Sequence, residues 1–265
     1  MNKTYALPLV AGILAVSFAS QNTFATCADI AAAGSLEDIA ATVVNAKDSG
    51  GFKLNMWVTV VDETGKVCQV VNSGSEAKDA NGFSNSTWLG SRVISAQKAN
   101  TANAFSLDGF SISTANLYGL TQPGGSLYGL QHSNPVDASR SYAGSPNTYG
   151  TAKDPLKNKR IGGVNVFGGG LALYTKHTHD GQDHFTKIGA VGVSGDTSCT
   201  DHAVAWKIRH GLSLDNVPAG FNDLDASNVN LKGDEIVIKD TVAANTWEHP
   251  TCAFAPTGAD NGVAP

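Results

Sequence analysis

The stretch FKLNMWVTVVDETGKVCQVV, residues 52–71, decides the fold class that the sequence predicts. Apolar, β-branched and aromatic residues alternate over 52–61, which is the pattern of a half-buried strand. Residues 62–65, Asp-Glu-Thr-Gly, are typical of a tight turn. Strand-forming residues return over 66–71. We therefore expect a β-hairpin over 52–71.

Helical and strand patterns surround this hairpin. Ser35 with Glu37-Asp38 is a helix start signal, and Ser198-x-x-Asp201 has the spacing of a capping box. The order helix, hairpin, helix, long loop, hairpin, helix predicts an α+β fold, in which helices flank a central antiparallel sheet. The predicted helices are 30–47, 88–106 and 198–212; the other predicted strands are 163–174, 188–193 and 235–238, with a polar turn over 175–187.

Residues 113–160 have a different composition, with four prolines, four tyrosines and many glycines. Too few apolar residues recur periodically here to form a separate domain. An irregular loop of this length in a compact chain is usually functional or a binding surface. We expect one domain over 26–265, with an irregular loop at about 113–160 and an extended tail at about 213–265.

The charge distribution argues against two classes of partner. Only 15% of the 265 residues are charged, the net charge is −5, and lysine and arginine form no block. Proteins that bind nucleic acid or an anionic membrane surface electrostatically need a basic patch. We therefore expect neither partner.

Residues 1–25 have the pattern of a signal peptide. Lys3 precedes an apolar stretch over 5–19, which is shorter than the roughly 17–25 residues that span a membrane comfortably. Thr23 and Ala25 favour cleavage before Thr26, with Ala19 as the other candidate. The sequence thus predicts a periplasmic or secreted protein that is not inserted in a membrane after cleavage.

Four cysteines, Cys27, Cys68, Cys199 and Cys252, remain after cleavage. An even number of cysteines in an oxidising compartment indicates two disulfides. Their wide spacing argues against a zinc knuckle or a thioredoxin-type site. Three pairings are possible, and we favour Cys27–Cys68 and Cys199–Cys252.

Two glycine-containing motifs carry no catalytic prediction. Residues 192–195, Gly-Val-Ser-Gly, are followed by Asp196, whereas a nucleophile elbow needs a glycine there. Residues 168–170 are three glycines without a following Gly-Lys-Ser/Thr, which excludes a phosphate-binding loop. Such glycines more often allow a bulge or the close approach of a neighbour. No catalytic residue is predicted.

His177, His179 and His184 form the densest group of histidines in the chain, beside Asp180 and Asp183. In an extended strand the first two point to the same face, and Asp180-Gly181 can turn the third back toward them. Three imidazoles suit a divalent zinc or copper ion. The alternative is a solvated hairpin turn.

His202, Trp206 and either Arg209 or His210 recur at helical spacing in the last predicted helix. Residues at this spacing share one face. Together they can ligate a metal, stack on a flat ring and pair with a carboxylate. The alternative is an ordinary half-buried helix face.

Three stretches together resemble one family: 57–62 with 65–67 (WVTVVD, GKV), 95–102 (SAQKANTA) and 189–196 (GAVGVSGD). They are similar to the exported haem-binding, haem-degrading family that includes HbpS and the GlcG-like proteins. The resemblance runs from about residue 30 to residue 212. Residues 163–170, Cys199 with Asp201-His202, and His249-Pro250-x-Cys252 are similar to a longer, signal-bearing branch.

The resemblance implies a small α+β fold that assembles into homo-oligomers and binds haem. Haem needs an axial ligand, an apolar slot and cations for its propionates. The hypothesis that follows is an exported haem-binding protein in haem or iron handling, with haem degradation as a further activity. Alternatives are an enzyme or sensor for another small organic ligand, or a structural oligomer without haem. The candidate residues are His202 or His132 as the ligand, Tyr118 and Tyr128 as walls or a tyrosinate ligand, Trp206 as a stacking surface, and Lys98, Arg92 or Arg209 as the cations.

Overall fold

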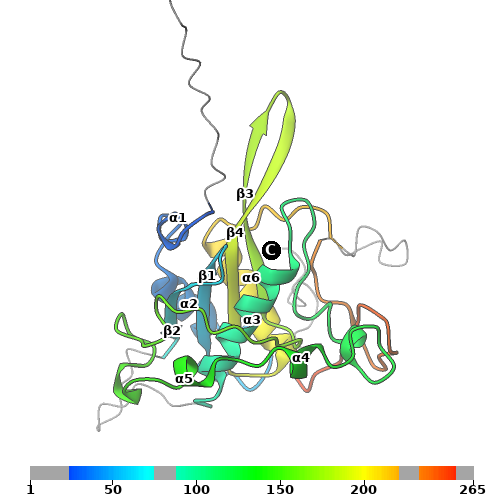
Figure 1. Cartoon of the computed structure of the whole chain (residues 1–265), viewed down its shortest axis with the longest axis horizontal. Helices are drawn as coiled ribbons and strands as arrows, with labels where there is room; N and C mark the ends of the chain where they lie inside the picture. The colour runs from blue at the N-terminus through cyan, green and yellow to red at the C-terminus, as the bar shows by residue number, and fades with distance from the viewer. Residues whose placement is uncertain (1–23, 75–87, 221–232, 255–265) are drawn as a thin grey trace, which may run out of the picture.

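The protein is described by a computed structural model over residues 24–74, 88–220 and 233–254. Its centre is a four-stranded antiparallel sheet in the order β2-β1-β4-β3 (Figure 1). The predicted α+β class with a central antiparallel sheet is confirmed. The strands are β1 (Trp57–Asp62), β2 (Val67–Asn72), β3 (Gly170–His179) and β4 (Gln182–Ser194).

Helices cover both faces of the sheet. On one face, α2 (Leu36–Asn45) and α6 (Ser198–Gly211) pack on side chains such as Val58 and Val191. On the other face, α3 (Ser91–Phe105) packs its alanines on Trp57 and Ala190. β1 contributes alternate residues to the two layers, because successive strand side chains point to opposite faces. Figure 1 shows the sheet between these helices.

Two helix predictions need correction at their ends. The stretch expected as one helix over 30–47 is two, α1 (Cys27–Ala31) and α2, because Ser35 caps a new helix by accepting a hydrogen bond from the Asp38 amide at 3.3 Å. Helix α6 is capped by Thr197, not Ser198, since the Thr197 side chain accepts from the amide of Thr200.

The second hairpin is longer than its apolar pattern indicates. The prediction of a polar turn over 175–187 is wrong: β3 and β4 pair over these residues, and only Asp180 and Gly181 make the turn. Their φ angles of +52° and +74° are those of a two-residue hairpin turn, for which Asp-Gly is a preferred sequence. The outer part of the hairpin extends beyond the sheet (Figure 1), so both of its faces are polar and show no alternation.

The segment between α3 and β3 includes the loop predicted over about 113–160. It has no strand of the sheet and contains short helical turns: η1 (Gly119–Thr121), α4 (Leu130–Ser133), α5 (Ala138–Ser141) and η2 (Pro146–Thr148). The strand predicted over 163–174 begins only at Gly170. The strand predicted over 235–238 is reduced to β5 (Ile238–Lys239), which pairs in parallel with β6 (His249–Pro250). Among the described residues, no helix has the length and apolar character of a membrane span.

Candidate functional site

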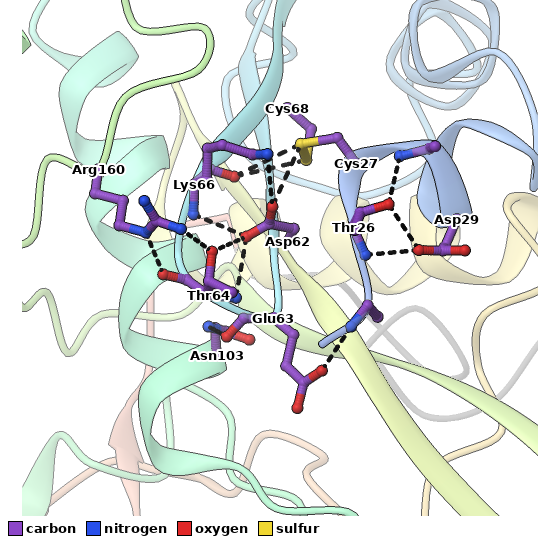
Figure 2. A network of polar contacts seen from close by, with 12 residues as sticks. Thr26, Cys27, Asp29, Asp62, Glu63, Thr64, Lys66, Cys68, Asn103 and Arg160 are labelled. Carbon is purple, nitrogen blue, oxygen red and sulfur yellow. Dashed lines mark hydrogen bonds and ion pairs between the residues drawn. A yellow bond between two sulfur atoms is a disulfide. The ribbon is translucent and has the colours of Figure 1, made fainter. Parts of the chain in front are cut away.

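Both predicted disulfides are present. Cys27–Cys68 joins the N-terminal helix to β2, and Cys199–Cys252 joins α6 to the tail. Figure 2 shows the first disulfide beside Asp62, whose carboxylate accepts from the amides of Thr64 and Lys66 at 3.0 Å each. Because all four sulfurs are in disulfides, the Cys-containing groups near Asp62 and near His249 are not thiolate metal sites.

The glycines at 168–170 allow two helices on opposite faces of the sheet to meet. A side chain at Gly169 would place its Cβ 2.5 Å from the carbonyl oxygen of Val193 and 3.1 Å from Lys98 Nζ. Lys98 of α3 therefore passes this point and reaches Asp201 of α6 at 2.7 Å. Its ammonium also donates to the Val193 carbonyl at 3.0 Å. Burial raises the pKa of Asp201 to about 6, against the opposing effect of Lys98.

His202 follows Asp201 and is completely buried. Neither Nδ1 nor Nε2 has a hydrogen-bond partner among the described residues. Burial lowers the pKa of His202 to about 3, so the imidazole is neutral at pH 7. Buried polar atoms without partners are unusual and call for an explanation, such as a bound ion, a water or a catalytic role. Trp206 Nε1 and Arg209 Nε on the same helix also have no hydrogen-bond partner among the described residues, but only His202 has no partner for any of its side-chain nitrogens. Among the residues near the glycines at 168–170, His202 is therefore the strongest candidate to bind a ligand or an ion.

Two turns further along α6, Arg209 makes a two-pronged ion pair with Asp234 of the tail at 2.7 and 3.0 Å. Both side chains are fully buried. Ser111 donates a third hydrogen bond to the same carboxylate at 2.7 Å. Burial opposes the ionised form of Asp234, but the positive charge of Arg209 and these hydrogen bonds keep its pKa below the usual value. The guanidinium also lies 4.5 Å from the centre of the Trp206 ring.

His249, in β6, lies next to Gly168, and the candidate ligands predicted from the sequence do not include it. Its Nδ1 donates to the Pro250 carbonyl at 2.8 Å, and its Nε2 accepts a long 3.4 Å bond from the Gly168 amide. Burial lowers the pKa of His249 to about 4. The ring of Tyr118 lies 5.3 Å away. The tail has no periodic pattern, so the sequence signal for this residue is the His249-Pro250-x-Cys252 motif.

The sequence of residues 32–209, more than half of the chain, matches the family model "Haem degrading protein HbpS-like". The chain belongs to the HbpS-like family. The match includes Lys98 and His202 but ends at Arg209, so the tail residues Asp234 and His249 lie beyond it.

Two solved structures are similar to this HbpS-like chain. One is the Klebsiella pneumoniae protein ORFY, of the family DUF336, with 23% identity over 74% of this chain and 95% of that chain and a TM-score of 0.41. The other is the PduOC:Heme complex, with 21% identity over 66% of this chain and 88% of that chain and a TM-score of 0.40. No curated protein matches the chain.

The three cations predicted for haem propionates are already engaged in buried ion pairs in this HbpS-like chain. Lys98 pairs with Asp201, and Arg209 with Asp234. Arg92 pairs with Asp154 through two nitrogens and lies 3.6 Å from the centre of the Tyr149 ring. A buried cation with a buried carboxylate partner is not available to a second anion, because the first carboxylate would lose its partner.

The remaining candidates lie apart from this cluster. His132, in α4, and Tyr128 are exposed, and no described hydrogen bond or ring contact joins them to His202. Tyr118 is half-buried and its ring lies 6.0 Å from that of Phe167, which is 43% exposed. The structure thus brings Trp206 and Arg209 together and places Tyr118 beside His249.

The donor chemistry at His202 fits haem at one nitrogen, because the buried imidazole is neutral and has a ring nitrogen free to bind iron. Its second nitrogen has no acceptor among the described residues, whereas metal-binding histidines usually donate that N–H to a carboxylate or carbonyl. The access of haem to His202, however, is blocked by neighbouring residues. A Cβ at Gly168 would lie 3.1 Å from the Cβ of His202, and the tail is fastened to this side of α6 by the Arg209–Asp234 pair and by Cys199–Cys252. A cavity of about 250 Å³ lies elsewhere, between α1 and the sheet, and is lined by residues such as Ile30, Val60 and Leu212.

Proposed function

We propose that this HbpS-like protein is an exported haem-binding protein that acts in haem or iron handling, and that His202 is its iron ligand. Membership of the family supports the ligand class. The observation that carries the residue assignment is the fully buried imidazole of His202, with neither nitrogen hydrogen-bonded among the described residues. Bound haem would supply the iron on which ligand exchange and redox chemistry depend.

Around the iron site, the protein's own residues would hold and shield the imidazole. The low pKa of His202 keeps the ring in its neutral form, so a metal does not have to compete with a second proton at neutral pH. Because His202 is covered, the tail has to move away from α6 before haem can reach it. The Cys199–Cys252 disulfide limits that movement.

Titration with hemin, followed by the Soret absorbance, tests the proposal. His202→Ala should lose the sharp Soret band that the wild-type protein develops. His210→Ala is the matched control, because His210 lies on the same helix but is exposed and paired with Asp215 at 2.6 Å. His132→Ala tests the accessible alternative. An unchanged band in His202→Ala would reject His202 as the ligand, and no band in the wild type would reject haem binding.

The 250 Å³ cavity favours the alternative of a small organic ligand. Its walls are mainly apolar, with Gln69 and Lys157 as its polar lining residues. It is smaller than the roughly 300–1,000 Å³ of typical ligand pockets, so it suits a compact molecule better than haem. A protein without a Soret band but with thermal stabilisation by a small apolar acid would support this function instead.

Export, assembly and haem degradation are further parts of the proposal. The signal-like residues 1–25 and the two disulfides support an oxidising, periplasmic or secreted location. N-terminal sequencing of the exported protein should give Thr26 as the first residue. Light scattering of the same protein tests the homo-oligomer, and loss of the Soret band over time with a reductant tests haem degradation.

A further inference from the structure

Three of the seven histidines of the chain lie on the outer part of the β3–β4 hairpin. β1 pairs with β4 only as far as Gly189, so within the described chain no third strand lies beside residues 175–187 (Figure 1). The Asp180-Gly181 turn places His177 directly opposite His184, and His179 opposite Gln182. Side chains at these positions share one face of the ribbon. All three imidazoles are exposed and contribute nothing to the core.

His184 lies between the other two imidazoles, and one of these two ring pairs is already at the spacing of a shared ion. The ring centres of His177 and His184 are 5.3 Å apart, and those of His179 and His184 are 6.4 Å apart. Two imidazoles on one tetrahedral ion, with metal–nitrogen distances of about 2.1 Å, have ring centres roughly 5 Å apart. The rings of His177 and His184 are nearly parallel, at 17°, and the ligand nitrogens of the three residues do not all lie within 4.8 Å of one another. These exposed side chains therefore have to rotate to bind one ion. His184 is the central ligand because it lies next to both others.

The charged side chains of the hairpin leave the histidine face free of positive charge and place a carboxylate beside His179. Lys176 and Thr178 alternate with the histidines and so lie on the opposite face, where both contact the Asp183 carboxylate, at 3.1 and 2.8 Å. The positive charge of Lys176 is thereby held away from the histidine face. Asp180 lies 3.2 Å from Nδ1 of His179. A carboxylate that accepts the second N–H of a histidine orients the ring and raises its basicity as a ligand.

We propose that His177, His179 and His184 bind a divalent transition-metal ion, Zn²⁺ or Cu²⁺, at the tip of the hairpin. Imidazole ligands suit these ions, whereas Mg²⁺ and Ca²⁺ prefer oxygen. Three protein ligands leave one tetrahedral position for water or another molecule, as in zinc sites that are not purely structural. The site is independent of the haem proposal, because it shares no residue with the cluster around His202.

Calorimetric titration of the full-length exported protein with Zn²⁺, and separately with Cu²⁺, tests the site. The wild type should bind one ion per chain, and Mg²⁺ should not compete. Loss of a partner around a ligand typically weakens metal binding roughly 10- to 100-fold, and loss of the ligand itself in His184→Ala should weaken it at least as much. His210→Ala is the matched control, since it removes one exposed imidazole elsewhere and should bind as the wild type does.

Asp180→Asn tests the positioning role of the carboxylate. Asn-Gly is also a preferred two-residue hairpin turn, so this variant keeps the register but loses the negative charge beside His179. We expect weaker zinc binding with an unchanged circular dichroism spectrum. Equal affinity in His184→Ala, His210→Ala and wild type would overturn the site. A Soret band altered by His184→Ala would overturn it too, by assigning these histidines to haem instead.

Discussion

The two groups of histidines in this protein differ in the burial of the imidazole. In the body of the protein, by which we mean the sheet with the helices and tail packed on it, His202 and His249 are buried. Burial lowers their pKa values to about 3 and about 4. On the hairpin, His177, His179 and His184 are exposed, and the rings of the first two each lie beside that of His184. The body thus contains neutral imidazoles that solvent does not reach. The hairpin contains accessible imidazoles whose side chains would have to be oriented by a bound ion.

Ion pairs show the same contrast. Arg209 and Asp234 are both 0% exposed, whereas Lys176 and Asp183 are 41% and 45% exposed. Removing one partner of a buried pair leaves an uncompensated charge, while an exposed pair is solvated without its partner. Equivalent substitutions in the two regions should therefore have very different effects, and four predictions test that difference.

The largest effect is expected for Arg209→Ala. It leaves Asp234 buried without its cation and should lower the free energy of unfolding by about 3–5 kcal/mol. Lys176→Ala is the matched variant on the hairpin and should change it by about 0–1 kcal/mol. Urea unfolding at pH 7 measures both. Similar losses in the two variants would show that the hairpin pair is as important to the fold as the buried one.

Loss of the tail disulfide should come next. Cys252→Ser frees the tail from α6 and should lower the free energy of unfolding by about 2–4 kcal/mol, because the unfolded chain gains freedom. If the tail covers His202, the variant should also bind hemin faster than the wild type in stopped-flow absorbance. Cys68→Ser is the control, since the Cys27–Cys68 disulfide lies in a separate polar network (Figure 2) and its loss should leave hemin association unchanged.

Acidification should destabilise the body through its buried histidines. Between pH 6.5 and about 4, an unfolded chain protonates His202 and His249, while the native pKa values of about 3 and about 4 keep them neutral. Each therefore lowers stability as pH falls, by about 1.4 kcal/mol per pH unit. Asp201, whose pKa burial raises to about 6, acts in the opposite direction between pH 6 and its ordinary value near 3.8, because the native state holds its proton.

His202→Leu tests this account. Between pH 6 and pH 4, the effect of Asp201 on the free energy of unfolding cancels the effect of one histidine. The wild type should therefore lose about 1.4 kcal/mol of stability per pH unit, which corresponds to one proton. Removing His202 should make the curve nearly flat from pH 6 to pH 4. It should also cost little at pH 7, because two buried nitrogens without partners are removed. Urea unfolding across this range is the measurement, and an unchanged slope in the variant would contradict the assignment.

The sequence predicts the central sheet and the helices packed on it well, because their apolar residues recur with strand and helix periods. The apolar pattern over 57–61 and the helical spacing in 88–106 and 198–212 are direct consequences of packing in or on a sheet. The strand predicted over 52–61 begins only at Trp57, so the pattern over 52–56 misplaced its start. The outer strands of the second hairpin could not be predicted, because neither face packs on a core. Their polar residues are indistinguishable from a loop, although the Asp180-Gly181 turn and the common face of His177 and His179 could be predicted from local geometry.

The candidate site was predictable only in part. Helical spacing predicts that His202, Trp206 and Arg209 are neighbours, and the structure places the Arg209 guanidinium against the Trp206 ring. Their partners come from segments distant in sequence. Asp234 lies 25 residues from Arg209, and Asp201 lies 103 residues from Lys98. A single sequence without periodicity in its tail carries no signal for such pairs, so the prediction treated the engaged cations as free for a ligand.

The smallest effect is expected at the hairpin turn. Gly181 has φ of +74°, and a Cβ added there would meet no described atom within 4 Å, so Gly181→Ala has only the backbone cost of a left-handed conformation, about 1 kcal/mol. Because the outer hairpin has no third strand among the described residues, this cost should appear as local opening. Amide hydrogen exchange over 176–185 should accelerate about fivefold, while the urea midpoint stays unchanged. Zn²⁺ should restore the protection in Gly181→Ala but not in Gly181→Ala/His184→Ala, since only the former keeps the three imidazoles. A fall in the urea midpoint would instead place the hairpin in the same cooperative unit as the body, and the contrast between the two regions would then be one of exposure alone.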